Sequence, residues 1–480
     1  MTSALIYAIH RTHLWWTCVG ANMGFDAVTV LTDRRGEGDH WTTDDYYRAF
    51  KTRIAAGDLS SDLLSAAEVD DVIARCRVLR WQTKRKAAAM ALAMADAMEA
   101  SLEALKPDYV VSFPIDNYNQ DVLARRARAR GLPYFEVTAS ALPDMCMLMH
   151  RGRLITSDDV PDPALVESRI KEIADPLFTP AYVQGQGAYT PARFLKTLGY
   201  FRVRAAYFKL YSWIRNDPLN IHYLDAQPSL GHKARFKDVR VTRMVEADWQ
   251  QKLAGFAAEK RVFMGLQVFP EAAIDYWLED KDLIQQEDFL VEAARRLTDA
   301  GFQIVVKDHP LQFGFRHTDL LDRLKAFTNV VIVPYEVSGN ALLAMCPINL
   351  TATGTLGLQC ALMGGTAISG EAYYVTDESD FIILRTWADL DSLPERVAAR
   401  ASPASLHSRQ YRIIERLMRG SFKAKFDSFR RFNPSSPSPD TAELGRQLGS
   451  QMRRLGPDGE DWHRRSMPPG GGRHAGSPLR

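Results

Sequence analysis

Short hydrophobic runs alternate with longer amphipathic stretches along most of the chain. Runs rich in Val, Ile, Leu and Phe have the length of buried strands, and the stretches between them have the composition of helices. In the first third, strands are predicted at 4–9, 27–31, 108–113 and 134–137, and helices at 11–23, 82–105 and 121–130. This order is typical of βαβ units around a parallel sheet.

The alternation stops between residues 155 and 245, where prolines, aromatic residues and basic residues are frequent. A mostly helical insertion is predicted there. It either contacts an acceptor or a lipid surface, or packs as a helical hairpin on the first domain. The alternation then resumes, with strands predicted at 261–266, 302–307, 329–334, 347–350 and 366–370 and helices at 288–300, 317–327, 338–345 and 355–363.

We therefore predict an α/β fold of two Rossmann-like, doubly wound domains with an interdomain cleft. At 480 residues the chain exceeds the ~250–300 residues at which single cores stop growing. A tail rich in Pro, Gly, Ser and Arg should be unable to bury enough apolar surface to fold. The predicted units are the domain 1–150, the insertion 151–250, the domain 251–400, closing helices in 401–433 and a disordered tail over 434–480.

Charge and cysteine usage narrow the functional classes. Sixty Lys and Arg residues against 58 Asp and Glu residues leave a formal net charge of +2, which argues against a dedicated nucleic-acid-binding protein. Five scattered cysteines fit a reducing cytosol and give no zinc-site spacing. No run approaches the ~18 apolar residues of a spanning helix, so we expect a cytoplasmic protein, either free or resting on the inner face of the membrane. The first βα turn of each domain has no GxGxxG, which argues against a dehydrogenase.

Four polar or rigid residues, Lys307, Asp308, His309 and Pro310, follow the predicted strand 302–307. Ligands of parallel sheets bind beyond the carboxyl ends of the strands, so these side chains are expected at the cleft. Pro310 favours an extended conformation at His309, whose imidazole can donate to a phosphate oxygen. The alternative is a histidine in an ordinary surface turn.

A second candidate phosphate site begins at Thr353-Gly354-Thr355, where small residues lead from a strand into a helix. The free N–H groups and the positive dipole end of a helix N-terminus bind anions. Gly354 admits a phosphate close to the backbone, and the two threonines add hydroxyl donors. The alternative is a helix that is merely capped by threonine.

Two acidic residues are candidates for proton transfer. Glu271 follows the strand 261–266, and Asp116 follows the strand 108–113 in the other domain. Asp116 is the best candidate for a general base on an acceptor hydroxyl, and Glu271 could bind the acceptor or transfer a proton. The alternatives are a helix cap at Glu271 and an ordinary turn at Asp116.

Four segments together resemble the capsule polysaccharide biosynthesis proteins, bacterial glycosyltransferases of the GT-B fold related to Kdo transferases. The combination of HP with a hydroxyl-rich helix start is also similar to bacterial sialyltransferases and CDP-glycerol glycerophosphotransferases. The segments are QVFPE (267–271), VVKDHP (305–310), TGTLGLQCALMGGTAI (353–368) and GEAYY (370–374). The resemblance implies that His309 contacts the donor phosphate and that the threonines bind phosphate at the helix start. One departure is Gln359, an amide in place of the usual acid that would bind the ribose hydroxyls, although it can still donate and accept hydrogen bonds.

The resemblance implies a metal-independent GT-B glycosyltransferase. The donor would be a nucleotide sugar, with a CMP-sugar such as CMP-Kdo favoured, bound by Lys307, Pro310, Thr353, Gly354, Thr355 and Gln359 in the second domain. The first domain would hold a capsular polysaccharide or lipid-linked acceptor, with His309, Asp116 and Glu271 as catalytic candidates. No further cofactor and no nucleic acid is expected, whereas a contact with the membrane or a capsule-assembly complex is. The alternatives are a nucleotide-sugar epimerase, a polyol-phosphate transferase, or a non-catalytic polysaccharide-assembly protein.

Overall fold

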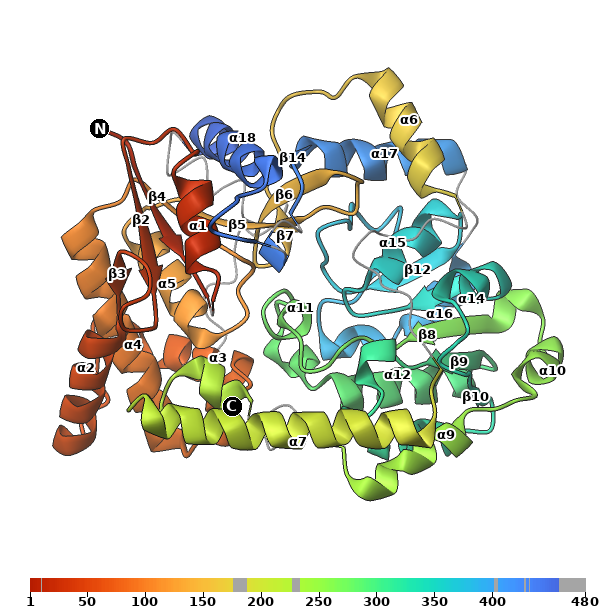
Figure 1. The fold of residues 1–480 in the computed structure, drawn as a ribbon. Coiled ribbons are helices and arrows are strands. Elements are labelled where there is room, and N and C mark those ends of the chain that lie inside the picture. Colours follow the sequence, from red (N-terminus) through yellow and green to blue (C-terminus); the bar gives the residue numbers. More distant parts are fainter. Residues whose placement is uncertain are drawn as a thin grey trace.

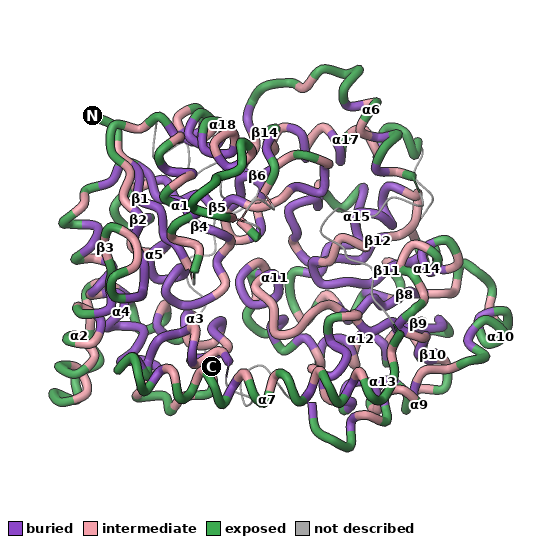
Figure 2. The backbone as a smooth tube through the Cα atoms, in the orientation of Figure 1, coloured by how far each residue is buried: buried purple, intermediate pink, exposed green. Residues whose placement is uncertain are grey.

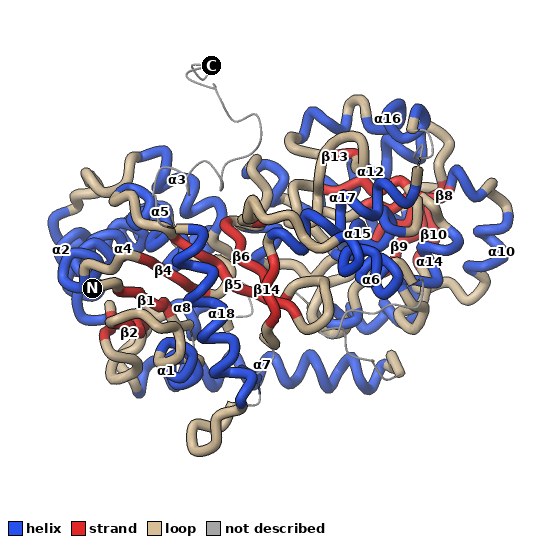
Figure 3. The backbone as a smooth tube through the Cα atoms, turned by 90° about the horizontal axis from the view of Figure 1, so that it is seen from above, coloured by secondary structure: helices blue, strands red, loops and turns tan. Residues whose placement is uncertain are grey.

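The computed structural model describes residues 1–9, 11–175, 188–226, 234–400, 405–426, 429–430 and 432–456. It consists of two lobes that lie side by side, each built around its own sheet (Figures 1 and 3). The predicted α/β class with two Rossmann-like domains is confirmed.

The first sheet has the strand order β14-β6-β5-β4-β1-β2-β3, and β7 pairs with β6. From β5 to β3 the strands are parallel, while β6 and β14 run antiparallel to their neighbours. The strands are β1 (Ser3–Tyr7), β2 (Ala27–Thr32), β3 (His40–Trp41), β4 (Tyr109–Ser112), β5 (Tyr134–Ala139), β6 (Met145–His150), β7 (Arg153–Leu154) and β14 (Ser421–Lys423). The helices are α1 (His13–Gly20), α2 (Thr43–Ala56), α3 (Ala66–Arg75), η1 (Leu79–Trp81), α4 (Lys84–Leu105) and α5 (Tyr118–Ala129).

The second sheet is parallel throughout and has the order β10-β9-β8-β11-β12-β13. Along the chain this is 3-2-1-4-5-6, the Rossmann order. The strands are β8 (Arg261–Gly265), β9 (Gln303–Lys307), β10 (Val330–Ile332), β11 (Ile348–Leu350), β12 (Thr366–Ser369) and β13 (Ile382–Ile383). The helical elements are α11 (Ala272–Asp275), η4 (Lys281–Ile284), α12 (Gln286–Asp299), η5 (Pro310–Gln312), α13 (Asp319–Lys325), α14 (Gly339–Met345), α15 (Thr355–Leu362), η6 (Trp387–Leu390) and α16 (Leu393–Ala399).

Both faces of the second sheet are covered, as a doubly wound fold requires. In β9, Ile304 and Val306 belong to one hydrophobic cluster, while Val305 between them belongs to another. Successive strand residues point to opposite faces, so the two clusters are the two sides of the sheet. Figure 2 shows the strands buried inside each lobe. This two-sided burial explains why the strands are continuous apolar runs in the sequence.

The insertion is helical where the structure describes it, and it bridges the two domains. Phe194 and Leu198 of α7 pack in the core of the second domain, whereas Leu219, shortly after α7, packs in the core of the first. A hairpin resting on the first domain alone is therefore not what forms. The elements are α6 (Pro163–Ile173), α7 (Pro191–Ile214), α8 (Ile221–Asp225), η2 (Phe236–Arg240), α9 (Val241–Met244), α10 (Trp249–Ala254) and η3 (Ala258–Lys260).

The C-terminal part of the described chain returns to the first domain. After α17 (Leu406–Arg419), β14 pairs with β6, and α18 (Pro439–Leu455) packs against α1. A methyl group at Gly445 or Gly449 would collide with backbone carbonyls of α1 or of the turn after it, so these glycines permit the close contact. The prediction of a disordered tail from residue 434 is wrong for α18, and residues 457–480 lie outside the described part.

In the described part of the chain, no helix is both long enough and apolar enough to cross a bilayer.

Candidate functional site

The order of the second sheet reverses between β8 and β11, and ligands of open α/β sheets bind at such a switch point. Gln267 follows β8, and Thr351, Thr353 and Gly354 follow β11. His309 follows β9, the other neighbour of β8. The two candidate phosphate segments therefore flank β8, about 10 Å apart for two strand spacings.

Gln267 connects the segments around it. Its Oε1 accepts hydrogen bonds from the Thr353 backbone N–H (2.8 Å) and the Thr351 hydroxyl (3.2 Å), and its Nε2 donates to Thr353 Oγ1 (3.1 Å). Its backbone carbonyl accepts a hydrogen bond from Arg316, which also pairs with Asp308. One side chain thus fixes the loop after β11 relative to the loops after β8 and β9.

The start of α15 has the features of an anion site. Gly354 is the N-cap residue, and because glycine has no side chain it makes no capping hydrogen bond to the first turn. The Tyr374 hydroxyl donates to the Gly354 carbonyl (2.8 Å), and Ser369 Oγ lies 3.0 Å from the same hydroxyl. These contacts fix the position of the Thr353–Gly354 loop. A methyl group at Gly357 would lie 2.5 Å from Tyr374 Oη. The packing therefore requires glycine at 357.

His309 is held in one tautomer. Its Nδ1 accepts a hydrogen bond from the Leu311 N–H (3.2 Å), so a neutral ring carries its proton on Nε2. Burial lowers the pKa of His309 to about 4, and the Lys307 and Arg316 cations add to this against the opposite effect of Asp308. The imidazole is therefore neutral at physiological pH and presents one N–H donor. Pro310 occupies the first position of η5, the short turn that fixes this geometry.

Buried charges surround the histidine. Lys307 and Arg316 are 9% and 8% exposed, and burial lowers the pKa of Lys307. Asp308 accepts hydrogen bonds from the Tyr335 hydroxyl (2.7 Å) and the His309 N–H (2.8 Å), and it lies 3.4 Å from Arg316 Nε. Asp308 and Glu336 both act on Lys307, and Asp308 also pairs with Arg316, so the two cations lie beside two carboxylates next to the histidine.

A small recess with a mixed polar and apolar lining adjoins Gln267 and Arg316 in the second domain. Gln286 and Glu287, at the start of α12, line it from the other side. Gln286 is 5% exposed, and within the described residues its Oε1 has no hydrogen-bond partner.

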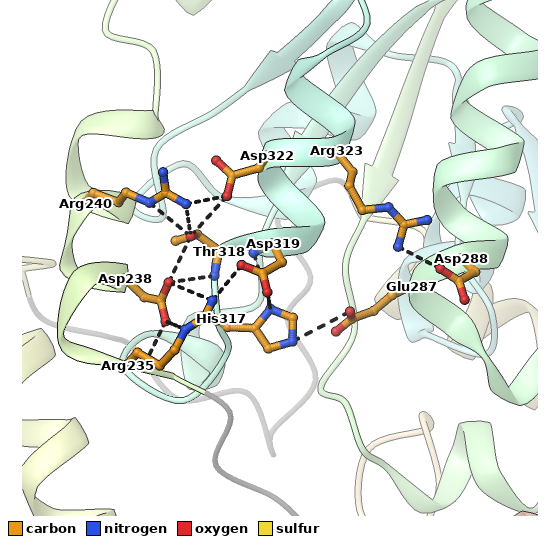
Figure 4. A network of polar contacts seen from close by, with 10 residues as sticks. All are labelled: Arg235, Asp238, Arg240, Glu287, Asp288, His317, Thr318, Asp319, Asp322 and Arg323. Carbon is orange, nitrogen blue, oxygen red and sulfur yellow. Dashed lines mark hydrogen bonds and ion pairs between the residues drawn. The ribbon is translucent and has the colours of Figure 1, made fainter. Parts of the chain in front are cut away.

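Figure 4 shows the network that holds the segment after Arg316. The Thr318 hydroxyl donates to Asp238 of η2 (3.0 Å), and Arg240 donates to Thr318 Oγ1 (2.8 Å). His317 lies 3.8 Å from Glu287 and 3.5 Å from Asp319. The insertion thereby anchors the loop that carries Arg316, although it lies outside both sheets.

At the junction of the domains, Arg77 joins acidic residues from both. Its guanidinium lies 2.8 Å from Asp116 in the first domain, 3.8 Å from Asp275 in the second and 2.7 Å from Asp225 in the insertion. Burial first and the negative Asp116 second, against the effect of Arg77, raise the pKa of Glu271 to about 7. The structure thus brings Asp116 and Glu271 to one place, at the meeting carboxyl edges of the two sheets.

Most of the predicted site residues form one connected region. Contacts run from His309 and Asp308 through Arg316 and Gln267 to the Thr353–Gly354 loop, and the Gln267 side chain also hydrogen bonds with Glu271. Thr355 is the first residue of α15. Gln359 lies one turn further along, 9% exposed, and its contact with a ribose stays a prediction. The described residues contain no cluster of three or more His, Cys, Asp or Glu side chains arranged to hold a metal.

Sequence reasoning missed three contributors: Gln267, Arg316 and Arg77. Gln267 lies in the QVFPE segment, so its position after a strand was a usable signal. No local signal identifies Arg316 or Arg77, because the role of each depends on partners distant in sequence. These partners are Asp308 and Gln267 for Arg316, and Asp116 and Asp275 for Arg77.

Comparison with known proteins gives distant structural likenesses only. No protein-family model matches the chain, and no curated protein matches it. Among solved structures, the KpsC beta Kdo 2,4 transferase of Thermosulfurimonas dismutans is 13% identical with a TM-score of 0.31, over 73% of this chain and 88% of that one. The Burkholderia multivorans trehalose 6-phosphate synthase is 12% identical with a TM-score of 0.32, over 100% and 99% of the two chains. The Methanocaldococcus jannaschii UDP-GlcNAc 2-epimerase is 12% identical with a TM-score of 0.27, over 87% and 99%. Similarity at this level does not identify a family.

Proposed function

We propose that this chain transfers a sugar from a nucleotide donor to a hydroxyl group of a polysaccharide or lipid-linked acceptor, with a CMP-sugar such as CMP-Kdo as donor. The observation that carries the proposal is the region around Gln267. There His309, Lys307, Arg316 and the start of α15 converge at the switch point of the second sheet.

The cations and N–H donors of this region would hold the donor phosphate. The N–H groups of the first turn of α15 and the His309 Nε2–H are hydrogen-bond donors, and Lys307 and Arg316 supply charge. These donors would stabilise the negative charge that develops on the phosphate oxygen as its bond to the anomeric carbon breaks. A neutral histidine suits this task, because its N–H is present throughout the physiological pH range.

Glu271 would accept the proton of the acceptor hydroxyl. Its pKa of about 7 leaves a substantial fraction ionised at neutral pH while keeping it a stronger base than an ordinary carboxylate. The acceptor oxygen then bonds to the anomeric carbon, the proton passes to Glu271, and the nucleotide leaves with the electron pair of the broken bond. Asp116 would be the positioning residue, since its charge raises the pKa of Glu271 and its ion pair fixes Arg77.

The first test is a thermal-shift screen of the chain with CMP, CDP, UDP and GDP. CMP is expected to raise the melting temperature most. His309→Ala should reduce that rise, whereas His407→Ala, which changes a surface histidine paired with Glu167, should leave it unchanged. Absence of a shift with all four nucleotides would contradict the proposal.

The second test is transfer itself. With a CMP-sugar and a polysaccharide acceptor, wild type should extend the acceptor, and His309→Ala should lose at least tens-fold in rate if one charge-assisted hydrogen bond of ~2–3 kcal/mol is lost. An altered free sugar nucleotide without transfer would instead indicate an epimerase.

A further inference from the structure

Helix α7 is strongly basic. Residues 191–215, which comprise the helix and its C-cap, contain six Lys or Arg residues and no Asp or Glu. In Figure 1 the helix runs along the lower edge of the molecule beneath both lobes, and Figure 2 shows much of it exposed. It is thus a long, positively charged element on the outside of the protein.

One side of α7 faces the protein. The buried residues are Phe194, Leu198, Ala205 and Ser212, spaced by four, seven and seven positions. At ~100° per residue these positions fall on a single narrow face. Phe201 and Phe208, beside this face, are half-buried against Phe315 and Tyr223, and the opposite side of the helix faces outward.

The outward side carries large apolar side chains. Residues 200, 203, 207, 210 and 214 follow spacings of three and four, which places them opposite the buried face, and residue 213 lies at the edge of this strip. Their exposed fractions are Tyr200 63%, Val203 71%, Tyr207 51%, Leu210 56%, Trp213 78% and Ile214 62%. Such a continuous strip is unusual for a surface that meets only water.

Five of the six basic residues border this strip, and the exposed Lys196 lies in line with it at the helix start. By the same helical geometry, Arg202 and Lys209 lie along one border, and Arg193, Arg204 and Arg215 lie along the other. Arg202, Lys209 and Arg215 are exposed. An apolar strip between two basic borders matches a bilayer surface, where the apolar side chains enter the acyl boundary and the cations meet lipid phosphates.

We propose that the exposed face of α7 binds the surface of a bilayer containing anionic phospholipid. Charge complementarity favours this occupant over a second copy of the chain, because pairing two such helices would bring six basic residues from each together. Tyr and Trp side chains, three of the six in the strip, are preferred at the bilayer interface. Because α7 bridges both domains, attachment would hold both against the membrane.

This inference goes beyond sugar transfer, and its test needs no donor or acceptor. The full chain is mixed with vesicles of phosphatidylcholine alone or with phosphatidylglycerol, and the bound fraction is measured by flotation. At low salt we expect binding at least about tenfold stronger with phosphatidylglycerol, weakening as salt is raised. Equal binding to both vesicle types, or to neither, would overturn the proposal.

Two double variants test whether the apolar strip of α7 is the surface that binds the vesicles. Val203→Glu with Leu210→Glu should reduce binding at least about tenfold, because both side chains lie in the strip. The matched control, Val160→Glu with Leu165→Glu, makes the same changes at exposed positions outside α7 and should alter binding less than about twofold. If both pairs lower binding equally, the proposal is wrong.

A third variant tests the charge. Lys196→Gln with Lys209→Gln should weaken binding about 25-fold, at about fivefold for each cation, with an unchanged circular dichroism spectrum. Size-exclusion chromatography with light scattering tests the competing occupant. A dimer that Val203→Glu with Leu210→Glu dissociates, without vesicle binding by wild type, would assign the face to a second copy and overturn the proposal.

Discussion

The fold disfavours the negative charge of Glu271. Burial is the main cause and the neighbouring Asp116 the next, so the pKa rises from its ordinary 4.5 to about 7. An acid with a higher pKa in the folded chain contributes stability that is fully present below its unfolded pKa and is lost as the pH rises through the folded pKa. Between about pH 4.5 and pH 7, therefore, the free energy of unfolding should fall because of this residue.

Glu271→Gln should remove this pH-dependent loss in the free energy of unfolding, because the amide stays neutral and resembles the protonated acid in shape. The two pKa values correspond to ~3.4 kcal/mol at high pH, of which ~2.5 kcal/mol develops between about pH 5 and pH 8. Glu271 keeps partial contact with solvent, which reduces the effect, so we expect about 1–2.5 kcal/mol.

The assay is urea unfolding followed by circular dichroism at both pH values, for wild type, Glu271→Gln and the control Glu259→Gln. Glu259 is an exposed residue of η3. Wild type and the control should lose more stability than Glu271→Gln when the pH is raised. If all three lose the same amount, the carboxyl group of Glu271 is not desolvated, and its assignment as the proton acceptor loses its basis.

Three further predictions concern the second domain. The His309 ring should remain in the Nε2–H tautomer and titrate near pH 4, as measured by nitrogen-15 NMR; a midpoint near pH 6.5 would contradict the burial argument. Gln267→Ala should lower the free energy of unfolding by about 1–3 kcal/mol, because it leaves the Thr353 N–H without its acceptor; an unchanged urea midpoint would show that the loops hold without it. Gly357→Ala should destabilise the chain by about 1–3 kcal/mol, and less in a Tyr374→Phe background, where the colliding hydroxyl is gone; equal penalties in both backgrounds would exclude this collision.

The longer parallel strands of both sheets could be predicted from the sequence, for a physical reason, whereas the antiparallel β6, β7 and β14 and the two-residue β3 and β13 were not predicted. A parallel strand covered on both faces must be apolar at every position, so stretches such as 302–307 stand out from their surroundings. α18 was missed because the composition of residues 434–480 as a whole hides its periodicity. Leu444, Leu448 and Met452 recur every four residues and are fully buried.

One part of the candidate site could likewise be predicted from the sequence, and another part could not. His309 and the Thr353–Thr355 segment were visible because each is a local pattern at the end of a strand. The position of Arg77 between Asp116 and Asp275 was not, because it depends on how two separately folded sheets face each other. Long-range electrostatic partners leave no mark in neighbouring residues, so they cannot be found from local sequence.

The return of β14 and α18 to the first domain has a consequence for how the chain is made. Residues 145–147 of β6 pair with β14, so this edge of the sheet stays open on the ribosome until residues 421–423 have emerged. The first domain is begun first yet finished last, after the whole second sheet has been synthesised. A chain cut after residue 400 would therefore damage the domain at its opposite end in sequence, with an unpaired strand edge exposed to aggregation.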